Sequence, residues 1–83
     1  MTVRATIIDH MTAIAAAAGT AVAADLADDT VLLRCGLDSL GFATLVARLE
    51  EALGYDPFTL MEQPVYPRTF GEFVAIYERH APR

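Results

Sequence analysis

The chain has 83 residues, enough for one domain but not for a second hydrophobic core, so we expect residues 1–83 to form a single domain. Its six arginines, absent lysines and eleven acidic residues give a formal charge of −5. This balance argues against a nucleic-acid-binding protein, which needs clustered cations, and favours protein partners with basic patches. A hydrophobic content of 54%, much of it alanine, indicates an ordered helical domain.

Cysteine content and hydropathy predict a cytoplasmic protein. The lone Cys35 excludes an intramolecular disulfide and suggests a reducing compartment. No segment has the roughly eighteen consecutive apolar residues of a membrane helix, so we expect no membrane partner. Asp9 and His10 interrupt the first apolar run, which therefore does not resemble a signal peptide.

Apolar residues at helical spacing predict a first helix from about Thr2 to Ala18, ended by Gly19. They are Val3, Ile7, Met11, Ile14 and Ala18. Residues 19–38 lack a clear period and are interpreted as a long loop, attached to the core by the apolar patch Val31, Leu32 and Leu33. A loop of this length in a small domain usually has a function.

A second helix is predicted from Ser39 to Leu53, ending at Gly54. At 100° per residue, its core face consists of Phe42, Leu45, Val46, Leu49 and Leu53. The opposite face consists of Leu40, Thr44, Ala47, Arg48 and Glu51.

The C-terminal part predicts one short helix and one longer helix. After Asp56 and Pro57 we expect a single turn over Thr59–Gln63, because Pro64 and Pro67 prevent a longer helix there.

Thr69 followed by Glu72 is a capping-box pattern and predicts a last helix from Phe70 to His80. That helix is expected to bury Phe70, Phe73, Val74 and Tyr77. No segment alternates with period two, so no sheet is expected.

Ser39, the only serine, lies where the long loop meets the second helix, in Gly36-Leu37-Asp38-Ser39-Leu40. Two interpretations fit this segment. Asp38 or Ser39 could simply cap the helix, as both residue types commonly do. Alternatively, Ser39 could carry a phosphodiester, which free backbone N–H groups and the helix dipole would stabilise at this position.

The run from Leu32 to Leu40 resembles the phosphopantetheine attachment motif of the acyl and peptidyl carrier protein family. The resemblance extends over about Leu26 to Tyr77, through Leu45, Leu49-Glu50-Glu51, Gly54, Asp56 and Pro67-Arg68-Thr69-Phe70. It implies an all-α fold, a small four-helix bundle with a long first loop and a short third helix.

The resemblance implies that Ser39 bears a covalent 4′-phosphopantetheine arm derived from coenzyme A, with Asp38 as the acidic residue of the motif. It also implies that Leu40 is an exposed contact for partner enzymes. With Leu40, we expect the docking surface to include Thr44, Ala47, Glu50 and Glu51.

The function implied is that of a monomeric carrier, not an enzyme, which holds an acyl or aminoacyl intermediate as a thioester. Its partners would be a phosphopantetheinyl transferase, an adenylating or acyl-transferring loading enzyme, and a downstream synthase or transferase. Gly41, Thr44 and Arg48 occupy positions where fatty-acid carriers have acids, which favours polyketide or nonribosomal peptide biosynthesis. A free-standing carrier and a module of a larger synthase both fit the chain.

Bulky aromatic residues favour a short cargo. Phe42, Phe70 and Phe73 are expected to fill the small interior, so a long acyl chain would have little room inside it.

Other interpretations are weaker. Cys35 is interpreted as a buried structural thiol, and His10 and His80 lack metal-ligand spacing. A catalytic triad with Ser39 and His80 would need a cleft that so small a bundle does not offer. The remaining alternatives are a helical interaction module without a prosthetic group and, less favoured by charge, a DNA-binding domain. The acids Asp25, Asp28 and Asp29 are interpreted as a solvated loop, too sparse in oxygen ligands for calcium.

Overall fold

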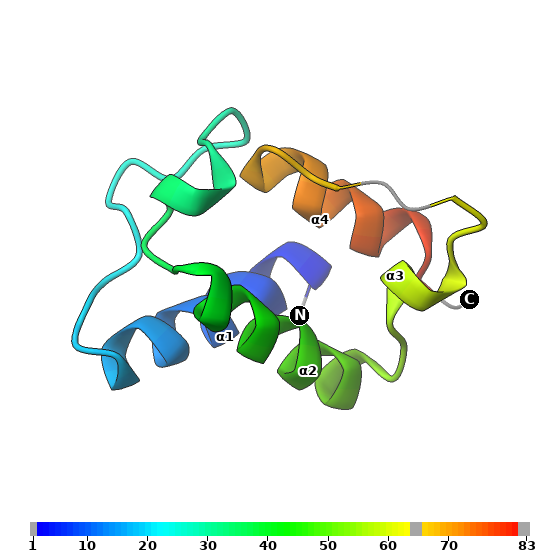
Figure 1. Cartoon of the computed structure of the whole chain (residues 1–83), viewed down its shortest axis with the longest axis horizontal. Helices are drawn as coiled ribbons and strands as arrows, with labels where there is room; N and C mark the ends of the chain where they lie inside the picture. The colour runs from blue at the N-terminus through cyan, green and yellow to red at the C-terminus, as the bar shows by residue number, and fades with distance from the viewer. Residues whose placement is uncertain (1, 64–65, 82–83) are drawn as a thin grey trace.

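The computed structural model describes residues 2–63 and 66–81, and over these residues it contains helices and no strand. The elements in chain order are α1 (Val3–Ala17), the 3-10 turn η1 (Leu32–Arg34), α2 (Ser39–Leu53), α3 (Pro57–Leu60) and α4 (Phe70–Arg79) (Figure 1). The predicted all-α bundle with a long first loop and a short third helix is confirmed.

Helix α1 packs against both α2 and α4. It begins after Thr2, whose side-chain oxygen accepts a hydrogen bond from the Ala5 N–H at 3.1 Å, as a capping threonine does. Its buried face consists of Ile7, Met11, Ile14 and Ala15. The prediction that Ala18 continues this face is wrong: the helix ends at Ala17, and Ala18 is exposed.

Helix α2 has the predicted bounds. Asp38 caps its N-terminus, and Gly54 ends it in the left-handed region with φ +85°, a backbone conformation that favours glycine. Leu45 and Leu49 are completely buried. Phe42, from the same face, is only half-buried and packs against the edge of the core cluster.

The position predicted for the short helix is wrong. Helix α3 spans Pro57–Leu60 rather than Thr59–Gln63. The Asp56 carboxylate accepts a hydrogen bond from the Phe58 N–H at 2.9 Å, and proline is well suited to the first helical position. Asp56 and Pro57 therefore start the helix instead of preceding it. The role expected of Pro64 falls outside the described residues.

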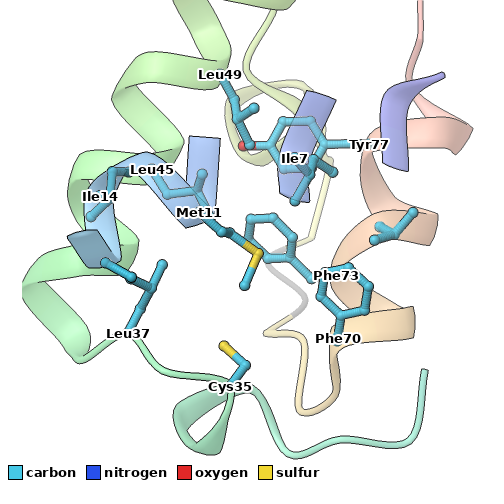
Figure 2. Close-up of a cluster of buried hydrophobic side chains, with 12 residues drawn as sticks. Ile7, Met11, Ile14, Cys35, Leu37, Leu45, Leu49, Phe70, Phe73 and Tyr77 are labelled. Carbon is cyan, nitrogen blue, oxygen red and sulfur yellow. The ribbon is translucent and has the colours of Figure 1, made fainter. Parts of the chain in front are cut away.

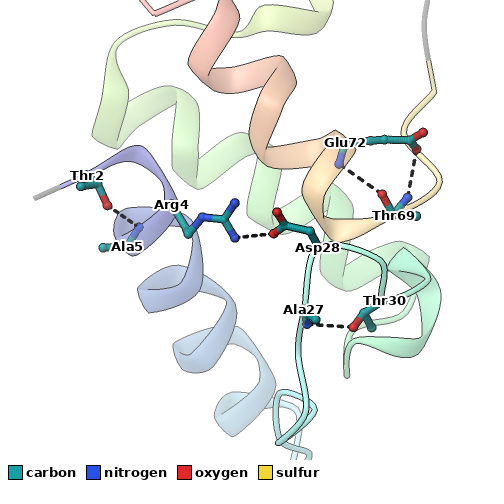
Figure 3. Close-up of polar contacts among 8 residues, drawn as sticks. All are labelled: Thr2, Arg4, Ala5, Ala27, Asp28, Thr30, Thr69 and Glu72. Carbon is teal, nitrogen blue, oxygen red and sulfur yellow. Dashed lines mark hydrogen bonds and ion pairs between the residues drawn. The ribbon is translucent and has the colours of Figure 1, made fainter.

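A complete capping box starts helix α4, as predicted. The Thr69 side-chain oxygen accepts from the Glu72 N–H at 3.2 Å, and a Glu72 carboxylate oxygen accepts from the Thr69 N–H at 3.2 Å (Figure 3). The helix ends at Arg79, one residue earlier than predicted, with His80 as its C-cap.

Side chains from α1, α2, α4 and the long loop form one buried cluster (Figure 2). Its aromatic part is continuous: the rings of Phe73 and Tyr77 are 5.1 Å apart between centroids, and Phe58 packs on both. The Tyr77 hydroxyl has no hydrogen-bond partner in the described part of the chain, and burial raises its pKa. This interior is densely aromatic, as expected from its phenylalanines.

The long loop is attached to the core differently from the prediction. Val31 is 48% and Leu33 65% exposed, so they do not enter the core, and only Leu32 is half-buried. Cys35 and Leu37 are the buried residues of this stretch. Val31 and Leu33 therefore face outward, and the side chains of Cys35 and Leu37, which follow the patch, anchor the loop in the core.

Backbone hydrogen bonds join the loop to the start of α4, beside which it lies (Figure 1). The Leu32 N–H donates to the Arg68 carbonyl, and the Phe70 N–H to the Thr30 carbonyl, both at 2.9 Å. The Gly71 N–H donates to the Asp28 carbonyl at 2.9 Å, and a Cβ at residue 71 would lie 2.7 Å from that of Asp28. Glycine allows this close approach.

Asp28, expected to be one of three solvated acids in the loop, instead forms an ion pair. The Asp28 carboxylate pairs with Arg4 of α1 at 2.6 Å (Figure 3). The Arg4 guanidinium also lies 5.6 Å from the centre of the Phe70 ring. The Arg4 and Asp28 side chains are 42% and 66% exposed, so water screens the ion pair and it contributes at most about 1 kcal/mol. It connects the loop to α1 as well as to α4.

Candidate functional site

Ser39 is the first residue of α2 and is exposed. The sequence left open whether it or Asp38 caps the helix, and the structure assigns the cap to Asp38, whose Oδ1 accepts from the Gly41 N–H at 2.7 Å. Over residues 2–63 and 66–81, the Ser39 hydroxyl makes no hydrogen bond. Its Oγ is therefore free for chemistry without loss of the helix cap.

Backbone donors lie next to this hydroxyl. The first N–H groups of a helix lack partners within it, and here the Gly41 and Phe42 N–H groups are bonded to the Asp38 side chain and carbonyl. The N–H groups of Ser39 and Leu40 have no acceptor among the described residues. An anion attached to Ser39 would meet these donors and the positive end of the α2 dipole.

Gly36 shapes the chain just before the site. It has φ +116°, in the region that favours glycine, and a Cβ there would collide with the Ala21 carbonyl group. Beside it, the Ala23 N–H donates to the Cys35 carbonyl at 2.8 Å. The loop therefore crosses itself closely here, and the crossing sets the direction in which the chain enters α2.

A groove of about 920 Å³ adjoins Ser39, which forms part of its wall. Its lining comes from the loop, α2 and the segment before α4, and is mainly apolar: Val31, Leu32, Leu33, Ser39, Phe42, Tyr66, Pro67, Arg68 and Thr69. Tyr66, 83% exposed, and Leu33 are its most exposed large apolar residues. The sequence analysis did not identify this groove. The feature that could have indicated it is the apolar run Val31–Leu33, which was instead assigned to the core.

The structure places the predicted docking residues along one helix. Leu40 is 75% exposed, and Ala47, Glu50 and Glu51 are exposed as well. Thr44 differs from the expectation: it is half-buried, and its hydroxyl donates to the Leu40 carbonyl at 3.1 Å. With Leu40 and Arg48 it lines a shallow groove against the end of α1.

Cys35 has the surroundings of a structural thiol. It is completely buried, and its Sγ lies 2.7 Å from the Leu32 carbonyl oxygen. Burial raises the pKa of the thiol, which keeps it protonated and unreactive near neutral pH.

Over residues 2–63 and 66–81, no three or more His, Cys, Asp or Glu side chains are grouped so that they could hold a metal ion. In the same residues, no helix has the length and apolar character needed to cross a bilayer. His80 has a local contact instead, its Nδ1 lying 2.9 Å from the Ile76 carbonyl oxygen.

Comparison with known protein families identifies the class of protein. The profile of the phosphopantetheine attachment site family matches residues 11–61, more than half of the chain and all of α2. The chain therefore belongs to this family, that of the acyl and peptidyl carriers, which carry covalent 4′-phosphopantetheine. Comparisons with curated proteins and with solved structures found no match.

The residues at the start of α2 fit that group. An exposed hydroxyl without a hydrogen bond, two free backbone donors and an adjoining apolar groove are what an attached phosphodiester with a long organic arm requires. The arm supplies a thiol on which a carrier holds its cargo as a thioester. Domains of this family are typically non-catalytic and interact with a phosphopantetheinyl transferase and with other enzymes.

Proposed function

We propose that this protein is a carrier that holds an acyl or aminoacyl intermediate as a thioester on a phosphopantetheine arm attached to Ser39, and that it is not itself an enzyme. The observation that carries the proposal is the state of the Ser39 hydroxyl, which is exposed, unbonded among the described residues, and located at the N-terminus of α2. Ser39 is also the only serine of the chain.

In the attachment step, the Ser39 Oγ forms a bond to the β-phosphorus of coenzyme A. The bond from that phosphorus to the bridging oxygen breaks, adenosine 3′,5′-bisphosphate leaves, and the hydroxyl proton passes to a base of the transferase. Asp38 holds the end of the helix in place, and the N–H groups of Ser39 and Leu40 stabilise the phosphodiester charge.

We propose the outer face of α2 as the docking surface for the transferase and for loading and downstream enzymes. Leu40 supplies an exposed apolar contact next to Ser39, and burial of such a side chain at an interface contributes on the order of 1.5–3 kcal/mol. Glu50 and Glu51 add negative charge that complements basic patches, while Thr44 and Ala47 lie between.

The cellular setting is part of the same proposal. Residues 1–83 act as a single monomeric carrier domain in the cytoplasm, without nucleic-acid or membrane partners, as the acidic charge and lone cysteine favour. The α2 positions Gly41, Thr44 and Arg48, which are not acidic, favour enzymes of polyketide or nonribosomal peptide biosynthesis as partners over those of fatty-acid synthesis. A cargo brought by a separate adenylating or acyl-transferring enzyme fits this setting.

The test is the intact mass of the purified chain after incubation with coenzyme A, Mg²⁺ and a broad-specificity phosphopantetheinyl transferase. The wild type and Thr59→Ala, which removes another exposed hydroxyl, should gain the mass of one phosphopantetheine group, and Ser39→Ala should gain none. A wild-type chain that is never modified would favour the alternative, a helical interaction module without a prosthetic group. Modification of Ser39→Ala would show that the attachment residue is a different one.

A further inference from the structure

The shallow groove that Leu40, Thr44 and Arg48 line against the end of α1 continues along the seam between α1 and α2, which pack side by side (Figure 1). It consists of two adjoining hollows of about 280 and 550 Å³, and Arg48 lines both of them. We propose that this seam groove is a docking site for an amphipathic helix of a partner enzyme, one that carries apolar side chains and a single carboxylate opposite Arg48. The inference rests on the proposed carrier function and extends the partner surface from α2 onto α1.

The lining of the seam groove recurs at intervals of four residues on both helices. It includes Leu40, Thr44, Arg48 and Ala52 on α2, and His10 and Ile14 on α1. A spacing of four is close to one helical turn, so each helix presents a ridge of side chains, and the groove lies between the two ridges. At 1.5 Å per residue, the groove follows α2 for about 18 Å, or about three turns.

The walls of the seam groove fit a helix better than an extended strand. The backbone groups within α1 and α2 are hydrogen-bonded inside each helix, so neither wall offers a free edge with which a strand could pair. A helix satisfies its own backbone and needs only side-chain contacts, which the two ridges provide. Ala17 and Gly41 keep the walls low where α2 begins, so a third helix can approach closely there.

Where α2 begins, the seam groove is mainly apolar. Ile14 and Ala17 of α1 line this end together with Leu40, whose side chain is 75% exposed. Asp38 also lines this end, but its carboxylate accepts a hydrogen bond from the Gly41 N–H and is engaged in the helix cap. An apolar side chain of the partner that covers Leu40 would remove both side chains from water, which is favourable in proportion to the apolar area buried.

The middle of the seam groove contains a cation without an ion-pair partner. Arg48 is the only basic residue of α2, and among residues 2–63 and 66–81 the only salt bridge joins Arg4 to Asp28. A carboxylate opposite Arg48 therefore gains a local attraction, although the net charge of −5 repels acids from the protein as a whole. Glu51 lines the next hollow and would repel a second acid, so a single carboxylate fits better than an acidic run.

Ser39 lines neither hollow of the seam groove. It is the neighbour of Leu40 at the apolar end, so a helix seated in the groove lies beside the attachment point without covering its hydroxyl. A partner enzyme can therefore hold the carrier through this helix while its active site receives the arm.

The experiment titrates helical peptides into the isotope-labelled full chain, in apo and in holo form, and follows the backbone amide NMR signals. The probes are acetylated, amidated, alanine-rich peptides of about 14 residues, a length at which such a helix begins to form in water. Each has a leucine stripe at helical spacing, and a position beside the stripe, scanned along the peptide, holds glutamate, glutamine or lysine. A glutamate peptide should shift the signals of Ile14, Leu40 and Arg48, and should bind about two- to fivefold more tightly than its glutamine counterpart.

Two variants of the seam groove are each paired with a control. Arg48→Glu should reverse the order of affinity, so that the lysine peptide binds more tightly than the glutamate peptide, and Ala17→Gln should weaken binding of every peptide by filling the groove. Arg34→Glu makes the same change of charge outside the groove, and Ala16→Gln enlarges the neighbour of Ala17, which does not line it. Both controls should bind as wild type does. All four substituted side chains are exposed, so the core stays intact.

The outcomes separate the seam groove from the carrier function. Absence of seam shifts with every glutamate peptide, equally tight binding of the lysine peptides there, or an unchanged order in Arg48→Glu would each refute the seam groove. Shifts confined to the groove beside Ser39 would refute it as well. A chain that gains mass at Ser39 but binds no peptide keeps the carrier function and loses the docking site, whereas a chain that binds the glutamate peptides at the seam but never gains mass would refute the carrier function alone.

Discussion

Substitutions at the two adjacent residues Asp38 and Ser39 should separate helix stability from carrier chemistry. Asp38 provides the side-chain cap of α2 through its 2.7 Å hydrogen bond with the Gly41 N–H, whereas the Ser39 hydroxyl has no hydrogen bond among the described residues. Asp38→Ala should therefore destabilise the protein, and Ser39→Ala should not. Asp38→Asn keeps a capping side chain and serves as the matched control.

The magnitude follows from the loss of one N-cap. Replacement of a capping aspartate by alanine costs about 0.5–2 kcal/mol. In a domain of this size, 1 kcal/mol corresponds to about 4–8 °C in Tm, so a cost of about 0.5–2 kcal/mol lowers the Tm of Asp38→Ala by about 2–16 °C. Ser39→Ala places the better helix former at the first helical position and should change Tm by less than about 2 °C.

Thermal unfolding followed by circular dichroism measures the first effect, and intact mass after treatment with the transferase measures the second. Ser39→Ala should be stable and unmodified. Asp38→Asn should be nearly as stable as wild type. Asp38→Ala should be less stable but still contain the Ser39 hydroxyl. If Ser39→Ala lowered Tm as much as Asp38→Ala, the assignment of the cap to Asp38 alone would be refuted.

Three further predictions concern the docking face, the interior and the thiol. Leu40→Ala should slow loading while leaving Tm nearly unchanged, and an unfolded Leu40→Ala protein would contradict this. Phe42→Ala should lower the free energy of unfolding by less than the about 3–5 kcal/mol that a fully buried phenylalanine costs, because the Phe42 ring is half-exposed. Octanoyl loading should leave Tm and the Leu49 signals unchanged, since the aromatic cluster fills the interior, and clear stabilisation would reveal an acyl cavity. Because Cys35 is buried and the pKa of its thiol is raised, a thiol reagent near pH 7 should label the native holo protein at the arm and leave the native apo protein unlabelled. Labelling of the native apo protein would contradict the burial of Cys35.

Local patterns were sufficient to predict the helices with strong boundary signals. The bounds of α2 follow from Asp38 and Gly54, and the capping box of α4 from Thr69 and Glu72, because the groups that satisfy a helix end are only a few residues away in sequence. The short helix was displaced in the prediction, since one turn has little periodicity and Asp56 could be interpreted equally well as a turn residue.

Neighbours distant in sequence decided what the local pattern could not. Hydrophobicity alone predicted that the patch Val31–Leu33 enters the core, but the hydrogen bond of Leu32 to the segment before α4 turns Val31 and Leu33 outward to form a groove wall. Likewise, a helical wheel placed Thr44 on the outer face, where the packing of α1 half-covers it. Burial depends on which elements meet, and periodicity does not contain that information.

The sequence by itself determined the class of protein and its candidate reactive residue. A lone serine between a glycine-containing loop and a leucine-rich helix is a local pattern, and Ser39 can be identified from residues within one or two turns of it. Tertiary structure alone decided that the Ser39 hydroxyl is free while Asp38 caps, and that an apolar groove lies beside it. The physical reason is that the groove is built from segments about thirty residues apart, which only backbone hydrogen bonds between the loop and the segment before α4 bring together.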